Sequence, residues 1–277
     1  MELEKTNLIC GNSKNMSALD DNSVHLVITS PPYFDLKEYN GKNNHDSGDQ
    51  IGNPISYEDY LNDLNQVWDE CMRVLVPDGK LCINIMPVFL SGNETEFERR
   101  VTKSVISDIE RHMYDTSQAY FHSLYIWDKR KSSRFSSFGS YPYPPNIFST
   151  YPYEWIIVFS KKGKRLAKDK PGKDVKEKSK LTKEEWADWA INSFWEMAPE
   201  SAKRIGHPAP FPEELPRRLI KLYSFYGDVI LDPFMGSGTT VKVANELGRI
   251  GVGYDINPEY IELTKKRLNL SQGELFD

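Results

Sequence analysis

The chain has 277 residues, of which 39% are hydrophobic, and its formal net charge at pH 7 is −5. This length supports one sizeable core, while the acidic balance gives no whole-chain sign of nucleic-acid binding. No apolar run reaches the roughly 18 residues of a membrane span, no apolar signal segment follows Met1, and the three cysteines are too far apart for a disulfide or metal set. We therefore expect a cytoplasmic protein without membrane contact.

The first informative stretch is a corner that follows a buried strand. Residues 24–29 form a β-branched run typical of a parallel strand covered on both faces, and the run ends at Ser30, Pro31, Pro32 and Tyr33. Because neither proline can continue a sheet ladder, we expect a stiff corner at the carboxyl end of the strand, where open α/β sheets bind ligands. The Ser30 hydroxyl and the carbonyls can accept from an –NH₂ group, and Tyr33 offers a face to a planar base. A purely structural turn is the alternative.

The middle of the chain alternates strands and helices. Residues 35–57 are polar and predict a long loop leading from the corner, and residues 56–75 carry apolar side chains at helical spacing. Further strands are expected at 80–85, 120–127 and 153–160, the last two as an antiparallel pair at the edge of the sheet. This alternation predicts an α/β fold.

Two stretches have the composition of a DNA-contacting surface. Residues 129–152 mix Lys, Arg, Tyr and Pro, which suits phosphates and unstacked bases, although a rigid surface loop has the same composition. Residues 161–183 hold eleven Lys or Arg and three Asp or Glu, a local charge of +8 that leaves −13 for the rest of the chain. A basic segment on an acidic chain indicates a footprint on the DNA backbone, and a solvated face is the alternative.

The last informative unit is a glycine turn between a strand and a helix. The apolar run 229–231 precedes it, and Gly236 and Gly238 let a ligand lie against the backbone, in front of the free N–H groups of the next helix. The strand that follows ends at Asp255, which is placed for the two hydroxyls of a ribose. The phosphate fingerprint is incomplete, and Asp232 would repel a pyrophosphate. A cationic ligand such as S-adenosylmethionine fits this loop better.

These two stretches resemble the motifs of DNA amino-methyltransferases, which methylate the exocyclic amine of adenine or cytosine. The family's catalytic motif is matched by Ser30-Pro31-Pro32-Tyr33, and its cofactor motif by Asp232-Pro233-Phe234-Met235-Gly236-Ser237-Gly238-Thr239-Thr240. The catalytic corner comes first and the cofactor loop last, which is the permuted order of the β class. The resemblance covers most of the chain.

The resemblance implies a doubly wound, mostly parallel, seven-stranded Rossmann-like methyltransferase sheet with an inserted target-recognition region. Residues 1–160 and 199–277 would form the catalytic domain, which binds S-adenosyl-L-methionine. Residues 161–198 would form the target-recognition insert, with the loops 35–57 and 129–152 contributing to it.

The resemblance also carries roles and partners. His207 and Phe211 are expected beside the methionine end of the cofactor, with a proline-stiffened linker as the alternative reading of that stretch. The expected partner is double-stranded DNA in a prokaryotic nucleoid. A cognate restriction endonuclease would be a functional partner rather than a bound one, and a monomer and a homodimer both stay open.

The cysteines bear on the reaction as well. A C5-cytosine methyltransferase needs a cysteine nucleophile after a proline, whereas Cys10, Cys71 and Cys82 follow Ile, Glu and Leu. We therefore expect direct transfer, without a metal, to the exocyclic amine of a flipped-out base. Serine at position 30 is typical of the cytosine-N4 enzymes, so N4 of cytosine is favoured over N6 of adenine. An RNA or protein methyltransferase and a non-catalytic DNA-binding relative are the remaining alternatives.

Overall fold

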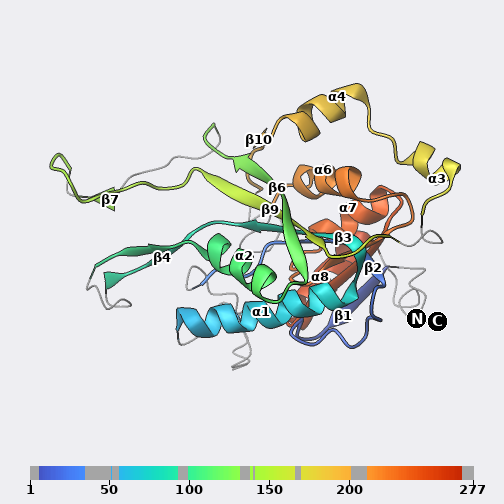
Figure 1. The fold of residues 1–277 in the computed structure, drawn as a ribbon, viewed down its shortest axis with the longest axis horizontal. Helices are drawn as coiled ribbons and strands as arrows, with labels where there is room; N and C mark the ends of the chain where they lie inside the picture. The colour runs from blue at the N-terminus through green and yellow to red at the C-terminus, as the bar shows by residue number, and fades with distance from the viewer. Residues whose placement is uncertain are drawn as a thin grey trace.

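The computed structural model shows one open sheet with helices on both faces (Figure 1). The structure describes residues 6–34, 51, 56–92, 99–131, 138–139, 141–165, 170–200 and 211–269. Among these residues, no helix has the length and apolar character needed to span a membrane. The predicted α/β class is confirmed.

The sheet has eight strands in the order β1-β12-β11-β2-β3-β9-β6-β10. They are β1 (Asn7–Cys10), β2 (Val24–Thr29), β3 (Leu75–Ile85), β6 (Ala119–Asp128), β9 (Tyr153–Lys161), β10 (Phe194–Glu196), β11 (Val229–Asp232) and β12 (Ile250–Asp255). Neighbouring strands are parallel except where β9 runs against β3 and β6. The mostly parallel, doubly wound sheet is therefore confirmed.

Two details of the sheet differ from the prediction. The seven expected strands become eight, because the short strand β10 pairs in parallel with the end of β6. The antiparallel pair of β6 and β9 is present, but β9 lies between β3 and β6 and not at the edge. Its central residues from Ile156 to Ser160 are all buried, as an internal strand requires.

Helices cover both faces of the sheet. The first apolar cluster lies under α1 (Tyr57–Val74) and α2 (Val105–Asp115), and the second lies under α6 (Glu214–Tyr223) and α7 (Thr239–Glu246). A fifth helix, α8 (Pro258–Leu268), contacts β1 and β12. Helices therefore cover both faces of the sheet. Because side chains on both faces are buried, the strands have continuous apolar runs rather than alternating ones.

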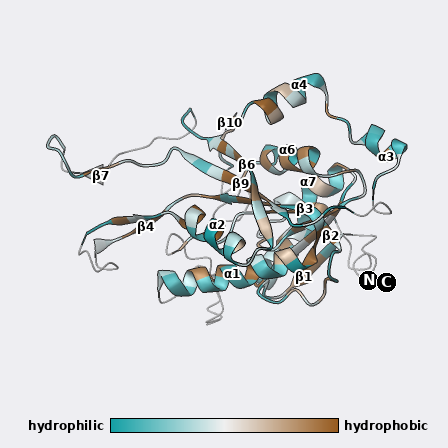
Figure 2. Cartoon of the chain, viewed as in Figure 1, coloured by the Kyte–Doolittle hydropathy of each residue, from teal (hydrophilic) through white to brown (hydrophobic). Residues whose placement is uncertain are grey.

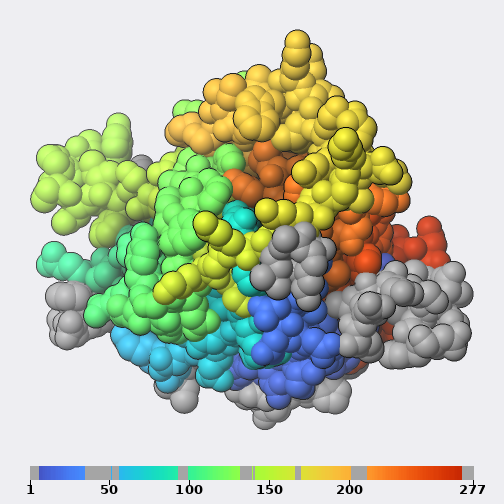
Figure 3. Space-filling model, turned by 45° about the vertical axis from the view of Figure 1, so that its right-hand side comes forward, coloured from blue at the N-terminus to red at the C-terminus, as the bar shows by residue number. Residues whose placement is uncertain are grey.

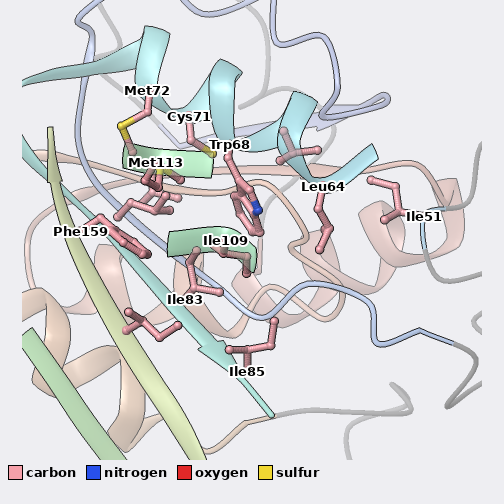
Figure 4. Packing of buried hydrophobic residues seen from close by; sticks show 14 of the residues in the cluster. Ile51, Leu64, Trp68, Cys71, Met72, Ile83, Ile85, Ile109, Met113 and Phe159 are labelled. Carbon is pink, nitrogen blue, oxygen red and sulfur yellow. The ribbon is translucent and has the colours of Figure 1, made fainter. Parts of the chain in front are cut away.

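Helix α1 shows how the sequence produces this packing. Its N-cap is Ser56, whose hydroxyl accepts from the backbone N–H of Asp59 at 3.1 Å. Figure 4 shows Leu64 and Trp68 on the buried side of the helix, above Ile83 of β3, and all three are fully buried. Burying a side chain of this size stabilises the fold by about 1.5–3 kcal/mol, so packing rather than helix propensity holds α1 in place.

The remaining elements lie around the sheet. Two hairpins project past the carboxyl ends of the parallel strands, β4 (Val88–Leu90) with β5 (Val101–Lys103) and β7 (Phe138–Gly139) with β8 (Ile147–Phe148) (Figure 1). The helix α3 (Lys173–Lys178) lies on the opposite side of the molecule in that view and is strongly hydrophilic (Figure 2). It is followed by α4 (Lys183–Glu185) and the π-helical turn η3 (Trp186–Ile191).

Candidate active site

The Ser-Pro-Pro-Tyr corner stands at the carboxyl end of β2, where the sequence places it. Tyr33 is buried, and its hydroxyl group donates to Oε2 of Glu154 at 3.0 Å. The hydroxyl of Ser30 lies 3.5 Å from that tyrosine oxygen. The carbonyl of Pro32 accepts from the hydroxyl of Tyr60, on α1, at 3.0 Å. These bonds hold the corner and the Tyr33 ring in one conformation.

One buried hydrogen bond joins this corner to the glycine loop. Thr29, the last residue of β2, donates its hydroxyl hydrogen to Oδ1 of Asp232 at 2.8 Å, across 203 residues of sequence. Asp232 is 1% exposed and also accepts from the hydroxyl of Thr240 at 2.7 Å and from the backbone N–H of Phe234 at 3.1 Å. These three donors use most of the acceptor capacity of a carboxylate. Asp232 therefore shapes the loop from within.

The turn adopts the backbone that its glycines allow. Gly236 and Gly238 have φ angles of 52° and 74°, in the left-handed region that favours glycine. A Cβ atom on Gly238 would lie 2.3 Å from Cγ2 of Thr264, on α8. Thr264 also donates its hydroxyl hydrogen to the carbonyl of Gly236 at 3.2 Å. At Gly238 the close approach that we expected of a ligand is thus made by α8.

Asp255 ends β12 at the same edge of the sheet. Its Oδ2 accepts from the backbone N–H of Gly236 and its Oδ1 from that of Asn257, both at 2.8 Å. An ionised carboxylate accepts about four hydrogen bonds, so acceptor capacity remains for two hydroxyl groups. Burial raises the pKa of Asp255 to about 6, against hydrogen bonds from Asn257 and Gly236. Burial likewise raises the pKa of Asp232 to about 6.

The other predicted loop residues are packed into the fold. Pro233, Ser237 and Thr239 are buried. The ring of Phe234 lies edge-on to that of Trp68, with 6.2 Å between the centroids. Arg267, on α8, donates to the carbonyl of Ser237 and to the hydroxyl of Thr239. The loop is therefore rigid before any ligand binds.

Three residues that the sequence reasoning missed complete the corner. Glu154, the second residue of β9, is 8% exposed. Besides the Tyr33 hydroxyl, its Oε2 accepts from Nδ2 of Asn84 at 2.6 Å, and its Oε1 accepts from Nζ of Lys129 at 2.6 Å. A signal was present, because Glu154 is an acid directly before the apolar run 155–159. Glu154 stands at the start of an antiparallel strand, whereas the topology of α/β sheets predicts ligand residues at the carboxyl ends of parallel strands.

The remaining predicted site residues are not linked to the corner by the described part of the structure. Phe211 is partly buried against the second apolar cluster, near α6. His207 and most of loop 35–57 lie outside the described residues. No group of three or more His, Cys, Asp or Glu side chains in the described part of the chain is arranged to hold a metal ion.

The basic segment 161–183 begins at the opposite, amino edge of the sheet. Lys161 donates to the carbonyl of Leu75, where β3 begins, and Arg165 pairs with Asp228, directly before β11, at 3.1 Å. Figure 3 shows this part of the chain, in yellow, on the surface beside the orange helices α6 and α7. The chain returns to the carboxyl edge through β10, which runs parallel to β6.

The fold and the site together define a Rossmann-like methyltransferase, and comparisons with known proteins narrow that class. The family described as "DNA methylase", of the N6 and N4 type, matches residues 24–266. The chain is 33% identical to the Type II methyltransferase M.MjaI of Methanocaldococcus jannaschii over 296 residues, which cover 96% of this chain and 91% of that protein. The chain therefore belongs to the N6/N4 DNA methylase family, as its two motifs predicted.

Solved structures agree with this assignment. TTHA0409 of Thermus thermophilus, a putative DNA modification methylase complexed with S-adenosyl-L-methionine, has a TM-score of 0.73 and 31% identity and covers 95% of this chain and 93% of its own. The cytosine-N4-specific PvuII DNA methyltransferase, at 17% identity and a TM-score of 0.58, shares the fold. The predicted cofactor is confirmed by the cofactor-bound relative, and Asp255, with acceptor capacity to spare beside the loop, fits it.

Proposed function

We propose that this DNA methylase transfers a methyl group to the exocyclic N4 amine of a cytosine in double-stranded DNA, within a restriction–modification system. The hydrogen bond from Thr29 to Asp232 carries the proposal, because it brings the catalytic corner and the cofactor loop to one edge of the sheet. The relatives M.MjaI and M.MthZI, both Type II methyltransferases, support the restriction–modification context.

The proposed roles follow from the contacts of each residue. S-adenosylmethionine, when bound, supplies a methyl group on a sulfonium, and the electron pair of the broken carbon–sulfur bond stays on sulfur. Asp255 holds the ribose, and the loop 232–240 bounds the cofactor site together with His207 and Phe211. The hydroxyl of Ser30 and the carbonyl of Pro31 accept a hydrogen bond from the amine, which draws the nitrogen lone pair out of conjugation with the ring. The Tyr33 ring, fixed through its hydroxyl, stacks on the flipped base.

The choice of cytosine rests on the residue at position 30. A serine hydroxyl can accept from the amine while donating elsewhere, and here it lies 3.5 Å from the Tyr33 oxygen as a donor. The N6 amine of adenine is the alternative, because the family includes both specificities. An RNA substrate is a weaker candidate, and a non-catalytic relative is disfavoured by the intact corner.

We assign the DNA contacts to the insert 161–198 and to the loops 35–57 and 129–152, with 1–160 and 199–277 as the catalytic domain. In the second loop, Tyr141 and Tyr143 are 95% and 72% exposed, at the tip of the β7–β8 hairpin. Exposed aromatic rings on an arm that projects past the carboxyl ends of the strands suit unstacked bases. A cognate endonuclease would act on the same DNA sites without binding this chain.

The test is to identify the methylated nucleoside. The protein is incubated with labelled cofactor and unmethylated duplex DNA, and the DNA is digested to nucleosides and separated. We expect label in N4-methylcytosine, no label after Tyr33→Ala, and unchanged labelling after Tyr120→Ala, an exposed tyrosine on β6. Label in N6-methyladenine alone would establish the adenine alternative, and label only in a parallel RNA sample would reject DNA as the substrate.

A further inference from the structure

The corner contains one polar atom that the proposed reaction leaves unused. Asn84, on β3, is 3% exposed, and within the described part of the chain its Oδ1 has no hydrogen-bond partner. Buried polar atoms are nearly always paired in folded proteins. An orphaned acceptor in a candidate active site therefore points to a donor that arrives with the substrate.

The sheet register places Asn84 beside the catalytic serine. Thr29 and Ile83 are Cα partners in the parallel pair of β2 and β3. Ser30 and Asn84 are the next residues along these two neighbouring strands. The two side chains therefore leave the sheet at the same height, one strand apart.

The same face of the sheet carries the partner of Asn84. Side chains two positions apart in a strand share a face, and Cys82 of β3 and Ile156 of β9 both belong to the second apolar cluster. Asn84 and Glu154 continue these two rows toward the carboxyl edge, where they meet at 2.6 Å. On this face of the sheet, the apolar residues of β3 and β9 are thus followed by the polar pair of Asn84 and Glu154, which lies level with the Ser-Pro-Pro-Tyr corner.

Glu154 determines which end of the amide is available. Nδ2 of Asn84 donates to Oε2 of Glu154, and a rotated amide would set Oδ1 against the carboxylate, acceptor against acceptor. The carboxylate itself is held by Lys129 on one oxygen and by the hydroxyl of Tyr33 on the other. Oδ1 is thus turned away from Glu154 and can only accept.

We propose that Oδ1 of Asn84 accepts a hydrogen bond from the target amine, and that Glu154 is the positioning residue that orients it. This inference rests on the proposed function. The amine has two hydrogens, so the Ser30 hydroxyl and the Pro31 carbonyl can share one of them in a three-centre hydrogen bond while the other bonds to Oδ1 of Asn84. With both N–H bonds engaged, the nitrogen lone pair is left for the incoming methyl group.

The chemistry explains why this hydrogen bond would accelerate the reaction. As the nitrogen–carbon bond forms and the carbon–sulfur bond breaks, the electron pair of the latter goes to sulfur and the nitrogen becomes positively charged. A hydrogen bond from a charged donor is stronger than one from a neutral donor, so the contact with Asn84 tightens in the transition state. The extra proton on nitrogen then passes to water, and Asn84 and Glu154 end the cycle unchanged.

The test compares the rate of transfer with binding. The variant Asn84→Leu keeps the size of the side chain and removes the acceptor. In single-turnover experiments with labelled S-adenosylmethionine and unmethylated duplex DNA, we expect its transfer rate constant to fall by about tenfold to a hundredfold, the effect of one hydrogen bond made in the transition state. The Kd values for cofactor and for DNA should stay within about twofold, since neither depends on that bond.

Three further variants make the result interpretable. Asn84→Ala carries the same test if the leucine variant does not fold, because a water can then take the donor's place at Glu154. Glu154→Gln should slow transfer too, since it releases the orientation of the Asn84 amide. Ser160→Ala removes another buried polar group of β9, one that donates to Asp78 at 3.3 Å at the far end of the strand, and should leave the rate constant unchanged.

Two results would overturn the inference. One is wild-type transfer rates in Asn84→Leu and Asn84→Ala. The other is a loss of rate that merely follows a loss of cofactor affinity or of melting temperature, which would show a packing role. Failure of the proposed function would look different, because the wild-type protein itself would then leave duplex DNA unlabelled.

Discussion

Each edge of the central sheet has a buried carboxylate beside basic side chains, and the two edges differ in the hydrogen-bonding capacity that they leave unused. At the amino edge, Asp228 is 9% exposed and pairs with Arg165 at 3.1 Å, with Nε2 of His25 at 3.6 Å. At the carboxyl edge, Glu154 pairs with Lys129 at 2.6 Å. In composition the two sites are alike.

Their neighbours separate them. The amino edge has a cleft of about 540 Å³, yet its cationic side chains have carboxylate partners. These pairs are Arg165 with Asp228, Lys80 with Asp78, and Lys221 with Glu185. His25 lies beside Asp228 through Nε2, while its Nδ1 accepts from the backbone N–H of Val229. At the carboxyl edge, by contrast, Asn84 keeps an acceptor without a donor among the described residues. A buried ion pair therefore points to a functional site only where a neighbouring polar atom still lacks a hydrogen-bond partner.

The largest effect on stability is expected at the amino edge. Asp228→Ala leaves the mostly buried Arg165 without its partner, and breaking a buried pair from one side costs about 3–5 kcal/mol of the free energy of unfolding. Methyl transfer per folded molecule should not change. Urea unfolding and the transfer assay measure the two quantities, with Asp228→Asn as the milder control. If Asp228→Ala stayed stable but lost methyl transfer, the amino edge would be the functional one and the comparison would be wrong.

A third buried carboxylate, Asp232, sharpens the comparison because its three donors are all neutral. Burial raises its pKa from 3.8 to about 6, so the folded chain holds a proton in this interval that the unfolded chain has released. Its contribution to stability is greatest below pH 3.8 and is lost as the pH rises through 6. Between pH 3.8 and about 6, the free energy of unfolding of the wild type should therefore fall by about 3 kcal/mol relative to that of Asp232→Asn.

Unfolding of both proteins in urea, at pH values from about 4 to about 8, gives this difference directly. A difference that does not vary with pH would mean that Asp232 stays ionised at the cofactor loop throughout.

Asp255 should affect cofactor binding directly. Asp255→Ala removes two acceptors for ribose hydroxyls, each worth about 1.5–3 kcal/mol for a charged acceptor, so the Kd for S-adenosylmethionine should rise at least tenfold. Because the pKa of Asp255 is raised to about 6, wild-type affinity should also weaken as the pH falls below 6. Calorimetry on the folded variant checks both effects, with Asp63→Ala, on α1, as the control. Unchanged affinity would remove Asp255 from the cofactor site.

The smallest effect is expected from the basic segment. Changing Lys170, Lys173 and Lys176 to Gln should flatten the slope of log K for DNA against log salt by about one unit for each phosphate that the segment no longer neutralises. The transfer rate at saturating DNA should not change, because the segment begins at the edge opposite the corner. Arg111→Gln, an equally exposed cation on α2, is the control. An unchanged slope would make this segment a solvated surface.

The sequence predicted best what is encoded locally. The corner and the glycine loop are contiguous motifs, so the residue types alone indicated their backbone, and the meeting of the two followed from sheet topology. Glu154 and Asn84 were not predicted because each is a single polar residue within or directly before an apolar run. Their roles arise from the pairing of β3 with β9, which sets Asn84 opposite Ile156 and beside Glu154. No spacing within either strand encodes that register.

The position of β9 was missed for a related reason. The antiparallel partner of β6 was expected at the sheet edge, as a hairpin would place it. The strand lies inside instead, because its apolar run supplies side chains to both clusters, Ile157 to the first and Ile156 to the second. Strand β10 is too short for periodicity to reveal, and Trp195, fully buried and stacked on Tyr125 at 4.3 Å, holds it in place.

The reversed direction of β9 has an evolutionary consequence. It brings both ends of the loop 129–152 to the same edge, where the backbone N–H of Lys129 donates to the carbonyl of Pro152 at 2.9 Å and closes the base of the loop. A segment closed at its base can lengthen, shorten or be exchanged between relatives without re-threading the sheet. On the proposed assignment of DNA contacts to this loop, relatives can acquire new DNA specificities by exchanging it, while the pair of Lys129 and Glu154 holds the Ser-Pro-Pro-Tyr corner in place.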